Sequence, residues 1–271
     1  MIKNPIFFSL LFLSFTPAHA DNKISQWEAG VGLAYFSSPH YLGSDQSANY
    51  ILPYPHVMVK SERFSINRNS IEGHVAEANF FKLDLTFGGN LKVDSDDNRA
   101  RAGMPDLDYV LEAGPSLKFL LHENAEKNSL ISFDIPIRAS IATDFSNVEA
   151  IGWRVIPTLH LLHAWPGKIR WELDGELRYL YGSKKYHDYF YTVDTQFVTA
   201  DRPAYQSESG TGGVQVKLRL KTYYRKMTLG IFMLYSDVSS AVYADSPLVI
   251  DNTNFSLGIF ASWTFAQGGE G

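Results

Sequence analysis

The feature that most constrains the fold of this chain is a strict alternation of apolar and polar residues, clearest in segment 168–181. Successive side chains of a β-strand point to opposite faces, so a strand separates the two sets, whereas a helix would spread the charges around its circumference. This segment is therefore predicted to be a strand with one apolar and one ionic face. The apolar face carries Ile169, Trp171, Leu173, Gly175, Leu177, Tyr179 and Tyr181, and the ionic face carries Arg170, Glu172, Asp174, Glu176 and Arg178.

The same alternation recurs in ten further segments. Each runs for ten to fourteen residues, whereas strands of soluble sheets usually have about five or six and a membrane crossing needs about 9–11. The chain is therefore predicted to be all-β, with strands long enough to cross a bilayer. The clearest segments are 81–93, 131–141 and 255–265, and the weaker ones are 27–36, 50–60, 62–75, 109–122, 152–163, 213–224 and 227–236.

The connections between these segments differ in length. Short ones lie at 123–128, 164–167 and 225–226, and long ones are expected near 37–48, 94–107, 183–211 and 237–253. Outer-membrane barrels combine tight periplasmic turns with long external loops, and single-chain bacterial barrels have an even number of strands. We expect one domain over residues 21–271, a transmembrane antiparallel up-and-down β-barrel. Twelve strands are predicted if segment 62–75 splits into two, and ten are the alternative.

Alternation alone does not separate a membrane barrel from a soluble lipocalin-like barrel. Three features favour lipid: the length of the segments, small residues on the polar face that leave room for long Arg and Glu side chains, and aromatic residues near strand ends. The small residues are Gly30, Gly32, Ala34, Gly230 and Gly258. Aromatic girdles of membrane barrels lie at the two lipid headgroup layers. The expected girdle residues are Trp27, Tyr35, Trp153, Trp171, Tyr179, Tyr181, Trp263 and Phe265.

The first twenty residues resemble a secretory signal, with Lys3, an apolar run over 6–15 and Ala18-His19-Ala20 at the expected cleavage site. Without them the chain carries 23 basic and 29 acidic residues and no cysteine. This balance argues against a nucleic-acid partner, which would require a basic patch. The expected location is the bacterial outer membrane, in contact with lipid and lipopolysaccharide.

The polar face holds the candidate functional residues. In a meander, segment 168–181 pairs with 213–224, so three acids should face three bases across the pair. These charges are interpreted either as pairs that fill a narrow barrel or as the wall of a channel that selects small polar solutes. The acids are Glu172, Asp174 and Glu176, the bases are Lys217, Arg219 and Lys221, and Asp134, Arg138, Arg170 and Arg178 belong to the same ionic lining.

The loop 183–211 is the candidate external binding surface or lid, because long loops are often functional and this one is too aromatic to be disordered. Its candidate residues are Tyr186, His187, Asp188, Tyr189, Phe190, Tyr191, Arg202 and Tyr205. The acidic run Asp94-Ser95-Asp96-Asp97 is a solvated loop or, alternatively, a site for a divalent cation that bridges lipopolysaccharide. It lacks the spacing of a calcium-binding loop.

Catalysis is not predicted. His160 and His163 are three apart on a strand and should point to opposite faces, so they do not form a metal pair. His187-Asp188 could orient a base, but no Gly-x-Ser-x-Gly motif accompanies it. We therefore expect no catalytic residue, no cofactor and no metal.

Several stretches resemble the MipA/OmpV family of MltA-interacting outer-membrane proteins. They are Tyr41-Leu42-Gly43-Ser44, Leu52-Pro53-Tyr54-Pro55, Arg63-Phe64-Ser65-Ile66, Tyr186-His187-Asp188-Tyr189-Phe190-Tyr191, Arg202-Pro203-Ala204-Tyr205 and Ala244-Asp245-Ser246-Pro247-Leu248-Val249. The resemblance implies an outer-membrane barrel with a scaffold role, linking a lytic transglycosylase to a peptidoglycan synthase. A small pore for polar solutes is the alternative, and a surface adhesin acting through 183–211 is a weaker one.

Overall fold

The computed structural model describes residues 24–61, 64–67, 70–78, 81–124 and 128–269. The expected secretory signal at 1–20 lies outside these residues. The strands are β1 (Ile24–Pro39), β2 (Ser47–Ser61), β3 (Phe64–Asn67), β4 (Ser70–Ala78), β5 (Phe81–Asn90), β6 (Tyr109–Asn124), β7 (Ser129–Thr143), β8 (Val148–Val155), β9 (Thr158–Trp165), β10 (Arg170–Gly182), β11 (Gly210–Tyr224), β12 (Met227–Asp237) and β13 (Thr253–Gly268). The helices are η1 (Ser95–Asp97), α1 (Lys184–Tyr191) and η2 (Thr195–Phe197).

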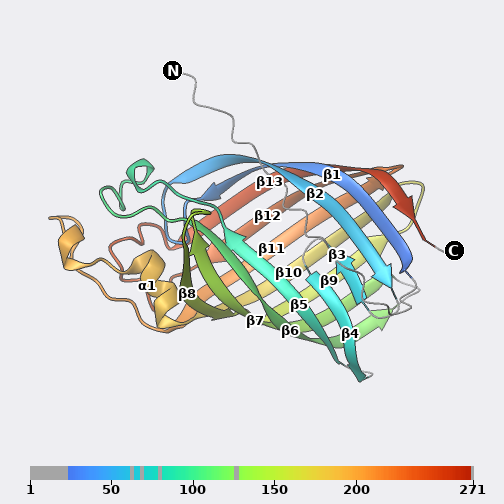
Figure 1. Cartoon of the computed structure of the whole chain (residues 1–271), viewed down its shortest axis with the longest axis horizontal. Helices are drawn as coiled ribbons and strands as arrows, with labels where there is room; N and C mark the ends of the chain where they lie inside the picture. The colour runs from blue at the N-terminus through green and yellow to red at the C-terminus, as the bar shows by residue number, and fades with distance from the viewer. Residues whose placement is uncertain (1–23, 62–63, 68–69, 79–80, 125–127, 270–271) are drawn as a thin grey trace, which may run out of the picture.

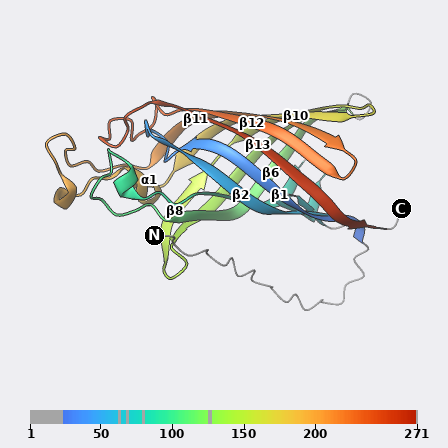
Figure 2. The ribbon, with the colours of Figure 1, turned by 90° about the horizontal axis from the view of Figure 1, so that it is seen from above.

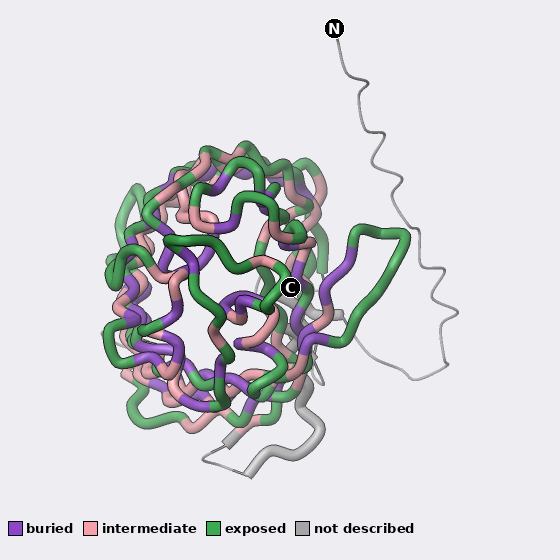
Figure 3. The backbone as a smooth tube through the Cα atoms, turned by 90° about the vertical axis from the view of Figure 1, so that its left-hand side faces the viewer, coloured by how far each residue is buried: buried purple, intermediate pink, exposed green. Residues whose placement is uncertain are grey.

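All strands belong to one antiparallel sheet in which strands that follow each other in the chain pair, except β8 and β9. β1 also pairs with β13, and β10 pairs with β11, so the series of pairings returns to its start. Figures 1 and 2 show the long tilted strands side by side, and Figure 3, from the loop end, shows the backbone as a ring. The predicted all-β, up-and-down barrel fold is confirmed.

Segment 152–163, expected to be one strand, is divided into β8 and β9 at Ile156-Pro157. Proline has no N–H to donate to the ladder, so the sheet is irregular at this point. β8 and β9 nevertheless both pair with β7 and β10, and together they occupy one place in the ring. Segment 62–75 splits into β3 and β4, as anticipated. The strand number of twelve stays a prediction, because residues next to β3 lie outside the described part of the chain.

The two faces of the strands are oriented as predicted. On β10, Leu177 is 52% exposed and points away from the ring, whereas its neighbour Glu176 is 4% exposed and points inward. Apolar side chains facing outward are stable only in an apolar surrounding, so the outward face is suited to hydrocarbon.

One expectation about strand length was wrong. Segment 81–93 does not continue as a strand to its end, because β5 stops at Asn90 and Val93 bridges Leu107 in the following loop, where it is buried.

The small residues of the inward face have a different role from the one expected. At Gly32, Gly230 and Gly258 a side chain would overlap an aromatic ring from a neighbouring strand, and at Gly30 it would overlap the backbone of Trp263, so these glycines do not make room for Arg and Glu. Tyr54 covers Gly32, Phe260 covers Gly230 and Phe232 covers Gly258. The expected arrangement occurs instead at Gly88, where an added Cβ would lie 2.6 Å from Nη1 of Arg138 and 3.0 Å from Oε2 of Glu112.

The buried apolar core lies in the long loops, at one end of the barrel (Figure 1). We call the loops 40–46, 91–108, 183–209 and 238–252 the cap. The opposite end carries short connections, among them 166–169 and 225–226, and we call it the turn end. None of the helices in the described residues is both long and apolar enough to span a membrane. The cap helix α1 was not expected from the strand pattern.

If the outward face contacts hydrocarbon, a charge at its centre should destabilise the barrel. Ile259, near the middle of β13, is 57% exposed. We expect Ile259→Arg to lower the free energy of unfolding by about 2–4 kcal/mol, measured by urea titration of the protein in lipid vesicles. Val198→Arg, at an exposed position of the cap, is the matched control and should change it by less than about 0.5 kcal/mol. Equal effects of the two would contradict a lipid-facing Ile259.

Candidate functional site

Strands β10 and β11 bring six predicted ionic residues together inside the ring. Their register places Glu172 opposite Lys221, Asp174 opposite Arg219 and Glu176 opposite Lys217. The Asp174–Arg219 contact is 2.8 Å and the Glu176–Lys217 contact is 3.3 Å, and Lys221 contacts Glu172. All three carboxylates are buried. A buried carboxylate is costly unless it is paired, so these contacts stabilise the inward face.

Three carboxylates of the lining are each shared by two cations, and we call these groups the cation-rich triads. Glu112, which sequence reasoning missed, lies 3.0 Å from Arg154 and 3.8 Å from Arg138. One carboxylate cannot balance two cations, so each triad leaves one positive charge over. The triads are Arg138–Glu112–Arg154, Arg178–Glu176–Lys217 and Arg170–Glu172–Lys221.

A second ionic group surrounds the predicted Asp134 on β7. Its carboxylate accepts a hydrogen bond from Ser132 at 3.0 Å and lies 4.0 Å from Lys118 and 3.9 Å from His160. Lys118 also contacts Asp84 at 3.1 Å. The signal for this group was available in the sequence, because β5, β6 and β7 are consecutive strands with charges on their polar faces.

The ionic lining surrounds a cavity of about 1540 Å³. One end of the cavity is bounded by cap residues such as Tyr41, His187 and Tyr243, and the other reaches Arg225 and Gln267 at the turn end. The cavity therefore follows the bore of the ring from the cap to the turn end.

One group in the bore has the composition of a metal site. Ligand atoms of His160, Asp174 and Glu176 lie within 4.8 Å of one another. The two carboxylates are already paired with Arg219 and Lys217, so a divalent cation would have to displace these side chains or be repelled by them. His163, as expected, is on the other face of β9, with its ring 4.5 Å from that of Trp165.

The helix α1 places the rings of the predicted lid at the centre of the cap. Ser183 is its N-cap and accepts a hydrogen bond from the Tyr186 N–H. Residues three and four apart share a helix face, which puts Tyr186, His187, Phe190 and Tyr191 together, all buried. The ring of Tyr191 stacks on Tyr243 with 3.6 Å between centroids and 8° between planes. Sequence reasoning missed Tyr243 and this helix, although the N-cap serine and ring spacing were visible.

The predicted candidate residues of loop 183–211 therefore serve mainly the interior of the cap. The buried Arg202 guanidinium donates to the carbonyls of Phe197, Ala100 and Ala102 at 2.9–3.0 Å. The Tyr205 hydroxyl donates to the Val242 carbonyl, and the Tyr189 hydroxyl accepts from the Asp108 N–H. An adhesive surface on this loop would have to use other side chains.

His187 and Asp188 do not form the base-orienting pair that their sequence allowed. The His187 Nδ1 lies 2.8 Å from the Glu208 carbonyl, and the other edge of the ring faces the backbone of Gly182. The Asp188 carboxylate accepts from the Thr192 hydroxyl at 2.7 Å and from Lys184 at 3.0 Å. Both side chains are thus used in holding the loop.

Four of the six stretches that carry the family resemblance lie in the cap. The Tyr41 hydroxyl donates to the Leu248 carbonyl at 2.8 Å, and the Tyr191 hydroxyl donates to the Leu42 carbonyl at 3.0 Å. The Ser246 hydroxyl donates to the Tyr191 carbonyl at 2.7 Å. Three stretches with partners up to 207 residues apart therefore build one structure.

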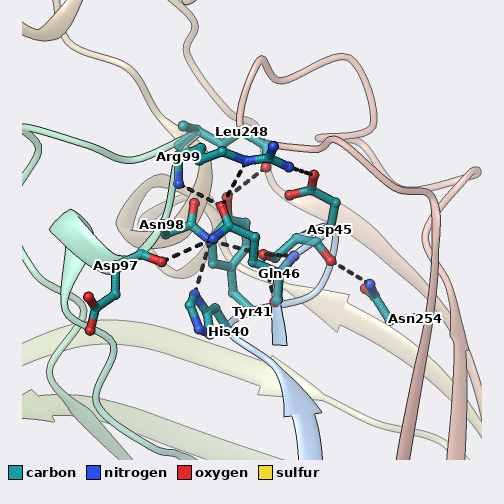
Figure 4. A network of polar contacts seen from close by, with 10 residues as sticks. His40, Tyr41, Asp45, Gln46, Asp97, Asn98, Arg99, Leu248 and Asn254 are labelled. Atoms are coloured by element: carbon teal, nitrogen blue, oxygen red, sulfur yellow. Dashed lines mark hydrogen bonds and ion pairs between the residues drawn. The ribbon is translucent and has the colours of Figure 1, made fainter. Parts of the chain in front are cut away.

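A second set of cap contacts joins turn 40–46 to the predicted acidic run (Figure 4). The fully buried Asn98 amide donates to His40 Nδ1 at 3.1 Å and to the Ser44 hydroxyl at 3.0 Å. In the acidic run itself, Asp94 accepts from the Asp96 N–H, and the Ser95 N–H donates to Asp106. The run thus forms a hydrogen-bonded turn.

The eight predicted girdle residues all lie on the outward face with exposed side chains. Trp27, Trp171, Trp263 and Phe265 are towards the turn end of their strands, and Tyr35, Trp153, Tyr179 and Tyr181 are towards the cap. Trp165, Tyr224 and Tyr235 extend the two sets and were not predicted.

Burial shifts the ionisation of the cap. Burial raises the pKa of Tyr243 to about 12. Burial also lowers the pKa of His187, against the opposing effects of the Glu208 carbonyl and Asp188, and lowers the pKa of His40, against the effect of Asp97. Both histidines are therefore held in the neutral form.

The cap should loosen in acid. Each cap histidine has a pKa below its ordinary value of 6.5, so the unfolded loop binds protons first. The contribution of the two neutral histidines to the stability of the cap is complete above about pH 6.5. It is lost as the pH falls towards their lowered pKa values. We expect amide hydrogen exchange protection of α1 to fall between about pH 7.5 and about pH 5, after correction for intrinsic exchange. His187→Gln should reduce this dependence, and His122→Gln, at an exposed position near the turn end, should not. An unchanged dependence in His187→Gln would contradict the assignment.

Comparison with known proteins places the chain in a family. The family model of the MltA-interacting protein MipA matches residues 31–265. No curated protein sequence matches significantly. Among solved structures, a bacterial polysaccharide outer membrane secretin is similar over 88% of this chain and 99% of its own, at 9% identity and a TM-score of 0.40.

The NanC porin is similar over 88% of this chain and 99% of its own, at 11% identity and a TM-score of 0.36. The outer membrane protease OmpT from Escherichia coli is similar over 95% and 100%, at 10% identity and a TM-score of 0.32. The family match covers most of the barrel and the whole cap, and it agrees with the resemblance found in the sequence. The chain belongs to the family of the MltA-interacting protein MipA and is an outer-membrane β-barrel protein.

Proposed function

We propose that this protein is a non-enzymatic scaffold that holds a lytic transglycosylase, and through it a peptidoglycan synthase, at the outer membrane. Membership in a family named for its interaction with MltA is the observation that carries this proposal. The side chains that could have suggested catalysis support it as well, because His187 and Asp188 are used inside the cap. The proposal assigns the protein a binding surface and no reaction.

The turn end is the surface that suits such a partner. Long loops of outer-membrane barrels lie outside the cell and short turns lie in the periplasm, where peptidoglycan is located. Three exposed cations lie on two turns at this end, Lys168, Arg225 and Lys226. A partner with an acidic patch would be steered to this end by charge.

The scaffold proposal predicts that binding depends on the turn end. We expect Lys168→Glu to weaken binding of a purified MltA-type lytic transglycosylase about fivefold, mainly by slowing association. The measurement is surface plasmon resonance with the full barrel in detergent. Lys185→Glu, which reverses an exposed lysine of the cap, is the matched control and should bind normally. Absence of binding by the unaltered protein in several detergents would contradict the scaffold role.

A small pore is the second candidate function, and the cavity is the observation that favours it. The cavity follows the bore over most of its length and has ionic side chains on its wall. Pores use such charges to select the solutes that enter. The two functions are compatible, because one uses the turn surface and the other uses the interior.

The pore proposal predicts single-channel steps in planar lipid bilayers. We expect steady steps from purified protein, with a conductance that changes in Glu176→Gln because Arg178 and Lys217 lose their shared partner. Thr199→Ala, in the cap, is a control without a charge change. A protein that is folded by heat-modifiability on a gel but silent in the bilayer would contradict the pore role.

A further inference from the structure

The bore has two unlike walls. The strands from β6 to β11 contribute the triads and Asp174–Arg219, whereas β12, β13, β1 and β2 contribute serine and threonine hydroxyls, apolar and amide side chains, and the rings of Phe36 and Tyr50. The acid that lines the cavity from this second wall, Glu28, lies 3.4 Å from His56. The described cavity-lining side chains of β12, β13, β1 and β2, which we call the neutral wall, therefore include one acid and no lysine or arginine.

One row of paired residues runs across the sheet from the charged wall to the neutral wall. Cross-strand pairing connects Asp174 to Arg219, then to Phe232, Gly258, Phe36 and Tyr50 on successive strands. The rings of Phe36 and Tyr50 are stacked with 5.3 Å between centroids, and Phe36 lies 6.0 Å from Phe232. A guanidinium is thus followed, along the same row of inward positions, by a group of three rings.

The cavity lining as a whole carries a surplus of cations. Among the described residues that line the cavity there are ten lysines and arginines and seven carboxylates. The cation-rich triads contribute three positive charges and Arg225 and Lys226 of the turn contribute two, whereas Glu28 and the Asp84–Lys118–Asp134 group each contribute one negative charge. The whole chain, by contrast, has a net charge of −5. The positive charge of the bore is therefore a local property, opposite in sign to that of the protein.

We propose that the bore binds and passes small organic anions that carry a ring, such as aromatic carboxylates. The surplus cations attract the carboxylate, and because they lie in a confined bore their field is less screened than at an open surface. The ring of such a solute fits the neutral wall, where Phe36 and Tyr50 line the cavity and offer aromatic contacts. Passage rests on the pore proposed above, whereas binding within the cavity does not.

The surplus can be removed without leaving a carboxylate unpaired. Arg138→Gln leaves Glu112 with Arg154, and Arg178→Gln leaves Glu176 with Lys217. The double variant therefore lowers the positive charge of the bore by two and keeps one cation on each acid. Lys185→Gln, in the cap, removes one cation outside the bore and is the matched control.

The first test measures ion selectivity in a planar bilayer under a potassium chloride gradient. We expect the unaltered protein and Lys185→Gln to prefer chloride over potassium. In the Arg138→Gln/Arg178→Gln variant the permeability ratio should fall about twofold or more towards one. A channel that prefers potassium, or that is unselective, would overturn the inference while leaving the pore intact.

The second test measures binding without passage, by calorimetry on the full barrel in detergent with benzoate as the probe. We expect benzoate to bind more tightly than acetate, which has no ring, and than benzamide, which has no charge. The double variant should lose benzoate affinity about tenfold, and Phe36→Leu should reduce the preference for benzoate over acetate. Binding with a silent bilayer would reject the pore but support the anion site. Equal weak affinities for all three probes, in protein shown to be folded by heat-modifiability, would overturn the site.

Discussion

The structure depends on one constraint, that a backbone in hydrocarbon must satisfy its hydrogen bonds without water. A ring of paired strands meets this condition and leaves each strand with one face towards lipid and one towards the bore. Apolar side chains such as Leu177 are thereby on the outside, and carboxylates such as Glu176 are inside next to their cations. The apolar core that a soluble protein would have at its centre is found in the cap, the part that projects beyond the lipid-facing strands.

The cap explains why the family resemblance is spread along the chain. Four of its six stretches come from loops far apart in sequence, and three of these are joined by hydroxyl-to-carbonyl bonds such as Tyr41 to Leu248 and Ser246 to Tyr191. Arg101 and Arg202 are buried among loop carbonyls, and donate to Phe190 and Ala100 respectively. The resemblance thus reports the architecture of the cap, in which polar and aromatic residues replace the sheet as the source of order.

The bore shows how a barrel can be stable and still carry a bias in charge. In every triad the carboxylate is paired, yet the second cation of each triad remains partly uncompensated. One cation for each acid would be enough to pair the buried carboxylates and keep the barrel stable. In the functions proposed above, the additional cations would act on solutes in the bore, whereas contacts with a partner protein would involve the turn end. The proposed scaffold and pore roles therefore use separate parts of one barrel.

Alternation of period two determined much of the fold from the sequence alone. It indicated the strands, the outward girdle and the pairing of Glu172, Asp174 and Glu176 with bases of the next strand, because face and neighbour follow from local pattern in a meander. The tertiary structure decided what depends on contacts between distant segments. These are the role of Glu112 between Arg138 and Arg154, the rings that cover Gly32 and Gly258, and the packing of α1 against Tyr243. No local period encodes such contacts, because they arise only when the closing of the ring brings separate strands and loops together.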